Sequence, residues 1–101
     1  MSKEKKKVRD EFRISVFKRD DYKCRVCKNG GILDAHHITN REAMPNGGYV
    51  AANGISLCSE CHIKAEKFYE TGVAVEGFSP NDLYILIGSS YDKAYAASFK
   101  L

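Results

Sequence analysis

The chain has 101 residues and a mass of 11.3 kDa, the size of one domain. Hydrophobic residues make up 44% and charged residues 29%, which is typical of globular proteins and excludes a fibrous or fully disordered chain. The longest apolar run, Leu83–Ile87, is too short to span a membrane. The Lys-rich start continues into the charged segment 8–11 instead of an apolar one. We therefore expect an intracellular protein, cytoplasmic or associated with the nucleoid.

Charge is distributed unevenly along the chain. The formal net charge is +3, but residues 1–28 carry eleven Lys and Arg against five Asp and Glu, whereas residues 29–101 carry five against eight. A basic first third favours a polyanionic partner, with nucleic acid as the first candidate. The lysines of residues 1–7 fit a solvated tail equally well, so charge alone leaves the function open.

The first half of the chain predicts a tail, a helix and a hairpin. Residues 1–7 have low complexity and are expected to form a flexible basic tail. Apolar residues recur every four positions over 8–20, which predicts a helix. Short apolar runs predict strands over 32–38 and 54–57, and the Gly-, Asn- and Pro-containing segment 39–53 predicts a loop between them.

The second half predicts three helices. The first begins near Cys58–Cys61 and runs to about residue 70, with Gly72 as its C-cap. Ser79 is the expected N-cap of a helix over 80–88, because a Pro and then an Asp follow it at the favoured positions. A last helix is expected over 91–100. Neither an internal repeat nor a linker to a second domain is evident.

Four cysteines form two pairs with metal-binding spacing, Cys24-x2-Cys27 and Cys58-x2-Cys61. Two residues between thiolates allow a tight turn to direct both sulfurs at one ion, and two such pairs complete a tetrahedral zinc site. Redox dithiols and buried free cysteines are the alternatives, but two matched pairs in an intracellular chain favour structural zinc. A four-thiolate site has no open position, so it would stabilise the fold without catalysing a reaction.

The three histidines, His36, His37 and His62, lie within or beside the interval between the cysteine pairs. His36 and His37 are adjacent on a predicted strand and should point to opposite sides of it. One can then bind a metal ion while the other acts as a base, as metal-assisted hydrolysis requires. His62 and Glu66 are one helical turn apart and could complete the metal site. Taken singly, His37 would more often be an ordinary strand-end residue and His62 an ordinary helix-surface residue.

The segments Leu33–Ile38 (LDAHHI) and Asn53–His62 (NGISLCSECH), preceded by the first cysteine pair, resemble the HNH endonuclease signature. The resemblance covers residues 24–66. It implies an α+β fold: a single small domain over 8–101 with a ββα-metal (His-Me finger) core at about 24–70, zinc knuckles and flanking helices.

The resemblance also implies a role for each residue of the site. His37 resembles the general base that activates the attacking water, and Asn53 resembles the residue that orders the loop between the strands and helps to fix the base. His36 and His62 resemble the ligands of one catalytic divalent cation. Glu66 falls where many members carry another His, Asn or Asp. The expected cation is Mg²⁺, Mn²⁺, Ni²⁺ or Zn²⁺, in addition to the structural zinc.

These expectations describe a metal-dependent DNA endonuclease or nickase that hydrolyses phosphodiester bonds. Double-stranded DNA would be bound by basic side chains: Lys5, Lys6, Lys7, Arg9, Arg13 and Arg41. Arg41 fits a solvated surface residue as well. A homodimer or a larger DNA-processing complex is compatible with this reading, as is a phage or mobile-element origin. The alternative is a non-catalytic zinc module that binds nucleic acid.

Aromatic residues offer a second route to nucleic acid, by stacking on bases. Phe12, Phe17, Phe68 and Tyr84 are spaced like core or helix residues. We therefore predict that they serve packing.

Overall fold

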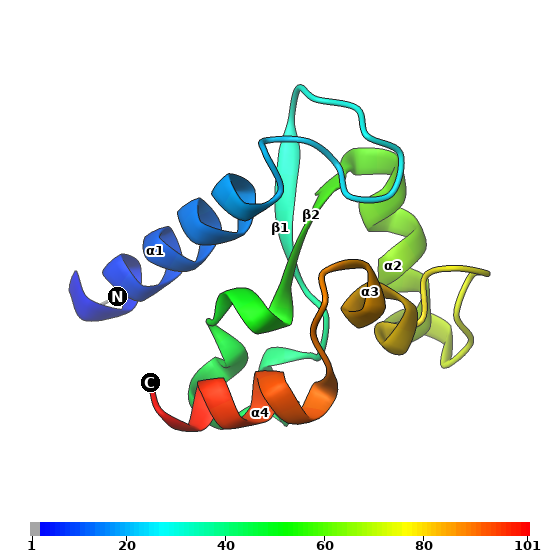
Figure 1. The fold of residues 1–101 in the computed structure, drawn as a ribbon. Coiled ribbons are helices and arrows are strands. Elements are labelled where there is room, and N and C mark those ends of the chain that lie inside the picture. Colours follow the sequence, from blue (N-terminus) through cyan, green and yellow to red (C-terminus); the bar gives the residue numbers. More distant parts are fainter. Residues whose placement is uncertain (1–2) are drawn as a thin grey trace.

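A computed structural model describes the backbone of residues 3–101 and the side chains from residue 5 onward. Its elements in chain order are α1 (Lys3–Arg19), β1 (Leu33–His37), the short 3₁₀ turns η1 (Arg41–Ala43), η2 (Pro45–Gly48) and η3 (Ala51–Asn53), β2 (Gly54–Cys58), α2 (Ser59–Thr71), α3 (Pro80–Leu86) and α4 (Tyr91–Phe99). The fold is α+β, as expected, with one β-hairpin among helices (Figure 1).

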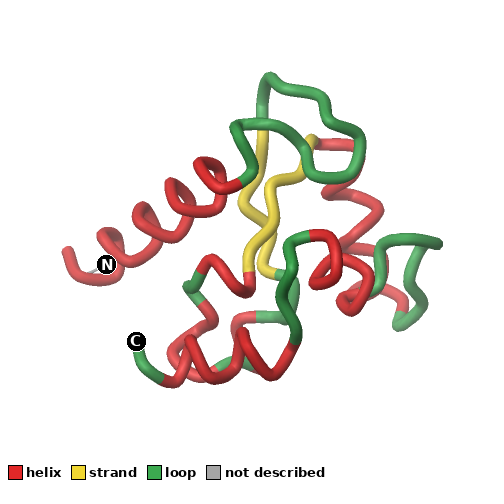
Figure 2. The backbone as a smooth tube through the Cα atoms, viewed as in Figure 1, coloured by secondary structure: helices red, strands yellow, loops and turns green. Residues whose placement is uncertain are grey.

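The hairpin stands between two helices. β1 and β2 pair antiparallel, with His36 opposite Ile55 and His37 opposite Gly54. Figure 1 shows α1 on one side of the hairpin and α2 on the other, and both helices contact both strands. The η turns connect the strands at one end, where α4 packs against them (Figure 2). Two faces of one hairpin are therefore covered by different helices.

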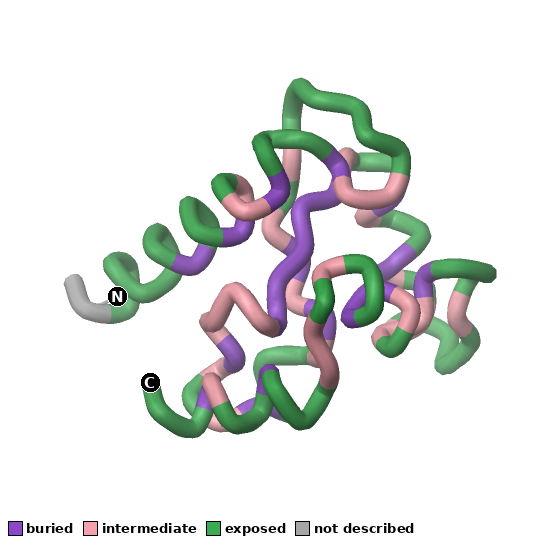
Figure 3. The backbone as a smooth tube through the Cα atoms, viewed as in Figure 1, coloured by how far each residue is buried: buried purple, intermediate pink, exposed green. Residues whose placement is uncertain are grey.

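The core is built around β2, which is buried along almost its whole length (Figure 3). Ile55 and Leu57 of this strand are fully buried. At Gly54 a Cβ atom would lie 2.5 Å from Cγ2 of Val16 and 2.7 Å from the ring of Phe12. The glycine therefore allows α1 to pack directly on the hairpin, beside His37.

The helix predicted over 8–20 begins earlier, because α1 starts at Lys3 and so includes most of the segment expected to form a flexible tail over 1–7. Lysine and glutamate are good helix formers, and no Gly or Pro separates this segment from the amphipathic part of the helix. A Lys7–Glu11 pair, with 3.9 Å between its charged atoms, adds support one turn apart. Residues 1 and 2 lie outside the described residues, and the domain boundary at residue 8 stays a prediction.

The other predicted elements are confirmed to within a few residues. Gly72 ends α2 with φ of 78°, the left-handed conformation that glycine adopts without strain. Ser79 and Asp82 form a reciprocal capping box at the start of α3. The predicted loop over 39–53 contains the three η turns. Among the helices that the structure describes, none is long and apolar enough to cross a membrane.

Candidate active site

The two histidines of β1 face different helices, as strand alternation predicts. His36 is 3% exposed and contacts α2, where its Nδ1 lies 3.2 Å from Oε1 of Glu66. His37 instead contacts α1, where its ring stacks on Phe12. Adjacent residues of one strand thus enter two separate groups of side chains.

The first group consists of His36, His62 and Glu66. Each offers one potential ligand atom, and these atoms lie within 4.8 Å of one another. Oε1 of Glu66 is also 3.2 Å from Nε2 of His62, so the carboxylate approaches both imidazoles. The other ring nitrogen of His36, Nε2, is buried without a hydrogen-bond partner among the described residues. Two imidazoles and a carboxylate fit one divalent cation with open positions.

Burial, followed by electrostatic interactions with His62 and His37, lowers the pKa of His36 to about 3. The imidazole is therefore neutral at pH 7, the form in which histidine binds a metal ion.

Asp34 supports this group from β1. Its Oδ2 lies 3.0 Å from Nδ1 of His62. A proton on Nδ1 that Asp34 accepts leaves the lone pair of Nε2 free for an ion, the arrangement common around metal-binding histidines. The sequence reasoning missed Asp34. The available signal was its position two residues before His36, on the same face of the strand.

The second group surrounds His37. The Phe12 ring stacks on it at a centroid distance of 4.4 Å, and the Tyr49 ring meets it edge-on at 4.8 Å. Nε2 of His37 is buried without a partner among the described residues. Burial, followed by the charge of Arg41, lowers the pKa of His37 to about 4, so the ring is neutral at pH 7. Two aromatic rings thus fix the orientation of a neutral imidazole.

Asn53 is fully buried and holds the loop together with four hydrogen bonds. Its Nδ2 donates to the carbonyl oxygens of Thr39, at 3.1 Å, and Gly48, at 3.2 Å. Its Oδ1 accepts from the backbone N–H of Thr39, at 2.9 Å, and from the hydroxyl of Tyr84, at 2.7 Å. The side chain therefore joins the segment that follows His37 to the η turns.

The four cysteines lie close together at the end of the hairpin opposite the η turns. Their sulfur atoms lie within 4.8 Å of one another, and Sγ of Cys27 and Sγ of Cys58 are 3.5 Å apart. All four are free thiols. Burial alone would raise the pKa of Cys24, but backbone N–H groups of Cys27, Cys58 and Val26 lower it to about 6. Four clustered thiols, one of them stabilised as a thiolate, fit a structural zinc ion.

Residues 24–68 match the family model described as HNH endonuclease. This segment is therefore similar to HNH domains. The match covers less than half of the chain and includes both cysteine pairs, the hairpin and most of α2. HNH domains are generally nuclease domains that use a divalent metal ion and act on DNA. Comparisons with curated proteins and with solved structures gave no match.

Two elements outside the HNH match contribute to the site. α1 provides Phe12, which stacks on His37. α3 provides Tyr84, which is 2% exposed and whose hydroxyl also lies 2.6 Å from Oγ1 of Thr39. The prediction that Phe12 and Tyr84 pack in the core is confirmed, but it missed their contacts with His37 and Asn53. No sequence signal distinguishes a buried Tyr that only packs from one that also donates a hydrogen bond.

Replacement of Tyr84 by Phe tests its hydrogen bond to Asn53. We expect a loss of about 1 kcal/mol of folding free energy, because Oδ1 of Asn53 loses one of its two donors. For a domain of this size that lowers Tm by about 4–8 °C, measured by thermal denaturation. The matched control is Tyr91→Phe at an exposed position of α4, which should leave Tm unchanged. Equal Tm values for both variants would contradict the prediction.

Three of the predicted DNA-binding residues line one cavity of the protein. Arg9, Arg13 and Arg41 line a space of about 320 Å³ together with His37 and His62. Lys5 lines a neighbouring cavity, whereas Lys6 and Lys7 are exposed on α1 and line neither of these two spaces. The structure therefore groups the three arginines with the histidines.

Proposed function

We propose that this protein is a metal-dependent DNA endonuclease or nickase, with His37 as general base and one divalent cation held by His36, His62 and Glu66. The observation that carries the proposal is the cavity of about 320 Å³ that both His37 and His62 line. A base and a metal ligand that border one space can act on the same phosphodiester. The family match supports the choice of nuclease chemistry.

In this proposal each side chain has a separate task. A divalent cation in the site would stabilise negative charge on the scissile phosphate and on the departing 3′ oxygen. His37 accepts a proton from the water that attacks phosphorus, and the arginines bind the strand through its phosphates. Asn53 acts indirectly, since its hydrogen bonds fix the loop that follows His37. The products are 5′-phosphate and 3′-hydroxyl ends.

The environment of His37 supports its role as a base. Its Nε2 is buried between aromatic rings, so we assign the proton transfer to Nδ1. The lowered pKa keeps the ring neutral at pH 7 but also weakens it as a base. A bound phosphate would offset this weakness, because its negative charge beside the ring favours the protonated form that arises during the reaction.

Incubation of the zinc-loaded protein with supercoiled plasmid tests the proposal. We expect conversion to nicked circles with Mg²⁺, Mn²⁺ or Ni²⁺, and no conversion when a chelator removes the added metal. Zinc content and circular dichroism of each sample show whether the protein remains folded. One site cuts one strand, so linear product should appear only later. Failure of the folded, zinc-loaded protein to cut with any of these metals would favour the non-catalytic module.

Replacement of Asp34 by Asn tests the metal site without removing a ligand. We expect metal affinity to fall by about 10- to 100-fold, because partners of ligating histidines commonly have effects of this size. Nicking at saturating metal should stay near the unmodified level. Isothermal titration with Mn²⁺ and a metal titration of plasmid nicking measure both quantities.

Glu66→Gln is the comparison for Asp34→Asn, since it alters a proposed ligand and should weaken metal binding more. If Asp34→Asn binds Mn²⁺ as tightly as the unmodified protein, the carboxylate at position 34 does not support His62.

A further inference from the structure

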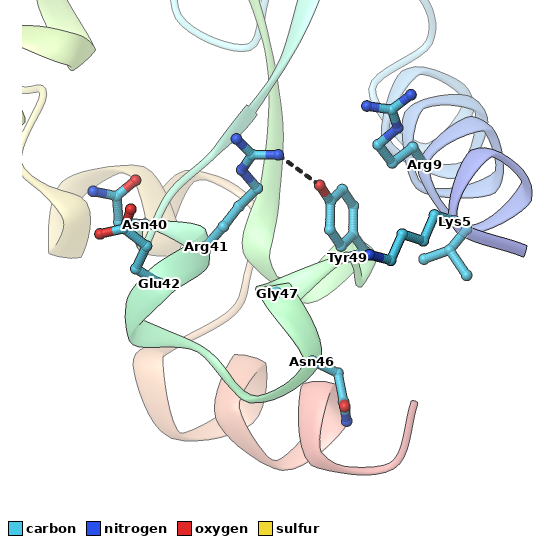
Figure 4. Close-up of a pocket in the computed structure, with 9 residues that line it drawn as sticks. Lys5, Arg9, Asn40, Arg41, Glu42, Asn46, Gly47 and Tyr49 are labelled. Carbon is cyan, nitrogen blue, oxygen red and sulfur yellow. Dashed lines mark hydrogen bonds between the residues drawn. The ribbon is translucent and has the colours of Figure 1, made fainter. Parts of the chain in front are cut away.

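A second cavity, of about 680 Å³, lies between α1 and the loop formed by η1 and η2 (Figure 4). Arg9, Arg41 and Tyr49 line both this cavity and the one that contains His37. The two spaces therefore adjoin, and the second extends the active site along α1.

The second cavity is positively charged. Lys5 and Arg9 project into it from α1, and Arg41 projects from η1 on the opposite side (Figure 4). Glu42 is the one carboxylate among the described residues that line it. Within the described part of the chain, neither Arg9 nor Arg41 forms a salt bridge. Guanidinium groups that form no salt bridge and face a cavity favour an anionic ligand, and phosphate in particular.

Tyr49 connects this cavity to the candidate base. Its hydroxyl accepts a hydrogen bond of 2.8 Å from Nη1 of Arg41, and its ring edge meets His37. Figure 4 shows the Tyr49 ring between Arg41 and the side chains of α1. At Gly47 a Cβ atom would lie 2.8 Å from Cε2 of Tyr49, so the glycine leaves room for the ring. One side chain thus orients both the arginine and the imidazole.

We infer that the second cavity binds the DNA phosphate next to the one that is cut, through Arg41 and Arg9, and that Tyr49 is a positioning residue that holds Arg41 toward this phosphate. The inference rests on the proposed function and names how the substrate enters the same site. Successive phosphates are joined by one nucleotide, so a strand with one phosphate beside His37 places the next in an adjoining space. Such contacts fix the strand in register without reading its bases.

A methylphosphonate scan tests the inference. Each duplex carries one uncharged methylphosphonate linkage, and a sequencing gel records Mn²⁺-dependent cleavage at the linkages on both sides of it. We expect cleavage to fall about tenfold at the neighbour on one side, because the charge that Arg41 binds is missing, and to stay unchanged at the neighbour on the other side.

Variants of the protein identify the side chain that contacts the phosphate charge removed by the methylphosphonate. Arg41→Gln should cut the unmodified duplex about tenfold more slowly. It should also lose the one-sided effect, because it has no guanidinium whose contact with the phosphate charge the methylphosphonate could remove. Tyr49→Phe keeps the ring and should weaken the one-sided effect. The control Lys93→Gln, at an exposed position of α4, removes an equal charge and should retain the effect in full. A one-sided effect that persists in Arg41→Gln, or an absent one in the unmodified protein, overturns the inference.

A binding measurement separates this inference from the proposed function. The logarithm of the affinity for an unmodified duplex is followed against the logarithm of salt concentration, without added catalytic metal. The slope for Arg41→Gln should be smaller in magnitude by about 1 than the slope for Lys93→Gln, which reports one lost phosphate contact. This result without any cleavage would support the phosphate subsite while the nuclease proposal fails. Equal slopes together with cleavage would overturn the subsite alone.

Discussion

Replacement of His37 by alanine should reduce DNA cleavage by about 10²- to 10⁴-fold, the usual contribution of a general base. The expected loss follows from geometry. His37 lines the cavity that also reaches His62, and two aromatic rings hold its imidazole in one orientation. Single-turnover cleavage of a labelled duplex with saturating Mn²⁺ measures the effect. Zinc content and Tm show whether the variant keeps its fold.

The alanine variant also leaves a space between Phe12 and Tyr49, which could alter the loop. His37→Gln is therefore the second variant, since it refills part of this space with a side chain that is not a base. Both variants should bind Mn²⁺ as the unmodified protein does, because His36, His62 and Glu66 remain in place. Cleavage within a few-fold of the unmodified rate in both folded variants would exclude His37 as the base.

Replacement of Cys24 by serine should abolish cooperative folding. Cys24 and Cys61 are buried, and the four thiols join the segment after α1 to the start of α2. Structural zinc contributes about 10–16 kcal/mol in small zinc-dependent folds, whereas a whole domain is stable by about 5–15 kcal/mol. Loss of one thiolate therefore removes a large part of the free energy of unfolding. Thermal denaturation by circular dichroism and zinc analysis measure the outcome.

Chelation provides the reversible counterpart of this variant. Prolonged chelation should unfold the unmodified protein, and an equimolar addition of Zn²⁺ should restore the fold. The control is His36→Ala, which removes a proposed ligand of the other metal group and should keep its zinc and a cooperative transition. A Cys24→Ser variant that melts within a few degrees of the unmodified protein would show that the cluster is not a structural zinc site.

Much of the site follows from spacing along the chain. Each cysteine pair has its geometry set by the two residues between its members, and the His36–His37 pair has its two directions set by strand alternation. The helix that carries His62 and Glu66 fixes their common face in the same way. These features are local, so the sequence was sufficient to predict them.

The supporting side chains depend on contacts between distant segments and could not be predicted in this way. Asp34 meets His62 across 28 residues, and Tyr84 meets Asn53 across 31. Tyr49 lies in a loop whose course is set by η turns and glycines, for which periodicity gives no signal. The start of the first helix was placed too late for another reason: the lysine-rich composition was taken to indicate disorder, although lysine has good helix propensity.

The placement of Phe12 and Tyr84 has a consequence for protein engineering. The segment that matches the HNH model runs from residue 24 to residue 68. The ring that stacks on His37, the proposed base, and the hydroxyl that donates to Asn53 come from helices on either side of it. Grafting the motif alone onto another scaffold would transfer the proposed site residues without Phe12 and Tyr84, the side chains that hold His37 and Asn53 in place. The transferable unit is the motif together with α1 and α3, and a successful chimera must inherit all three.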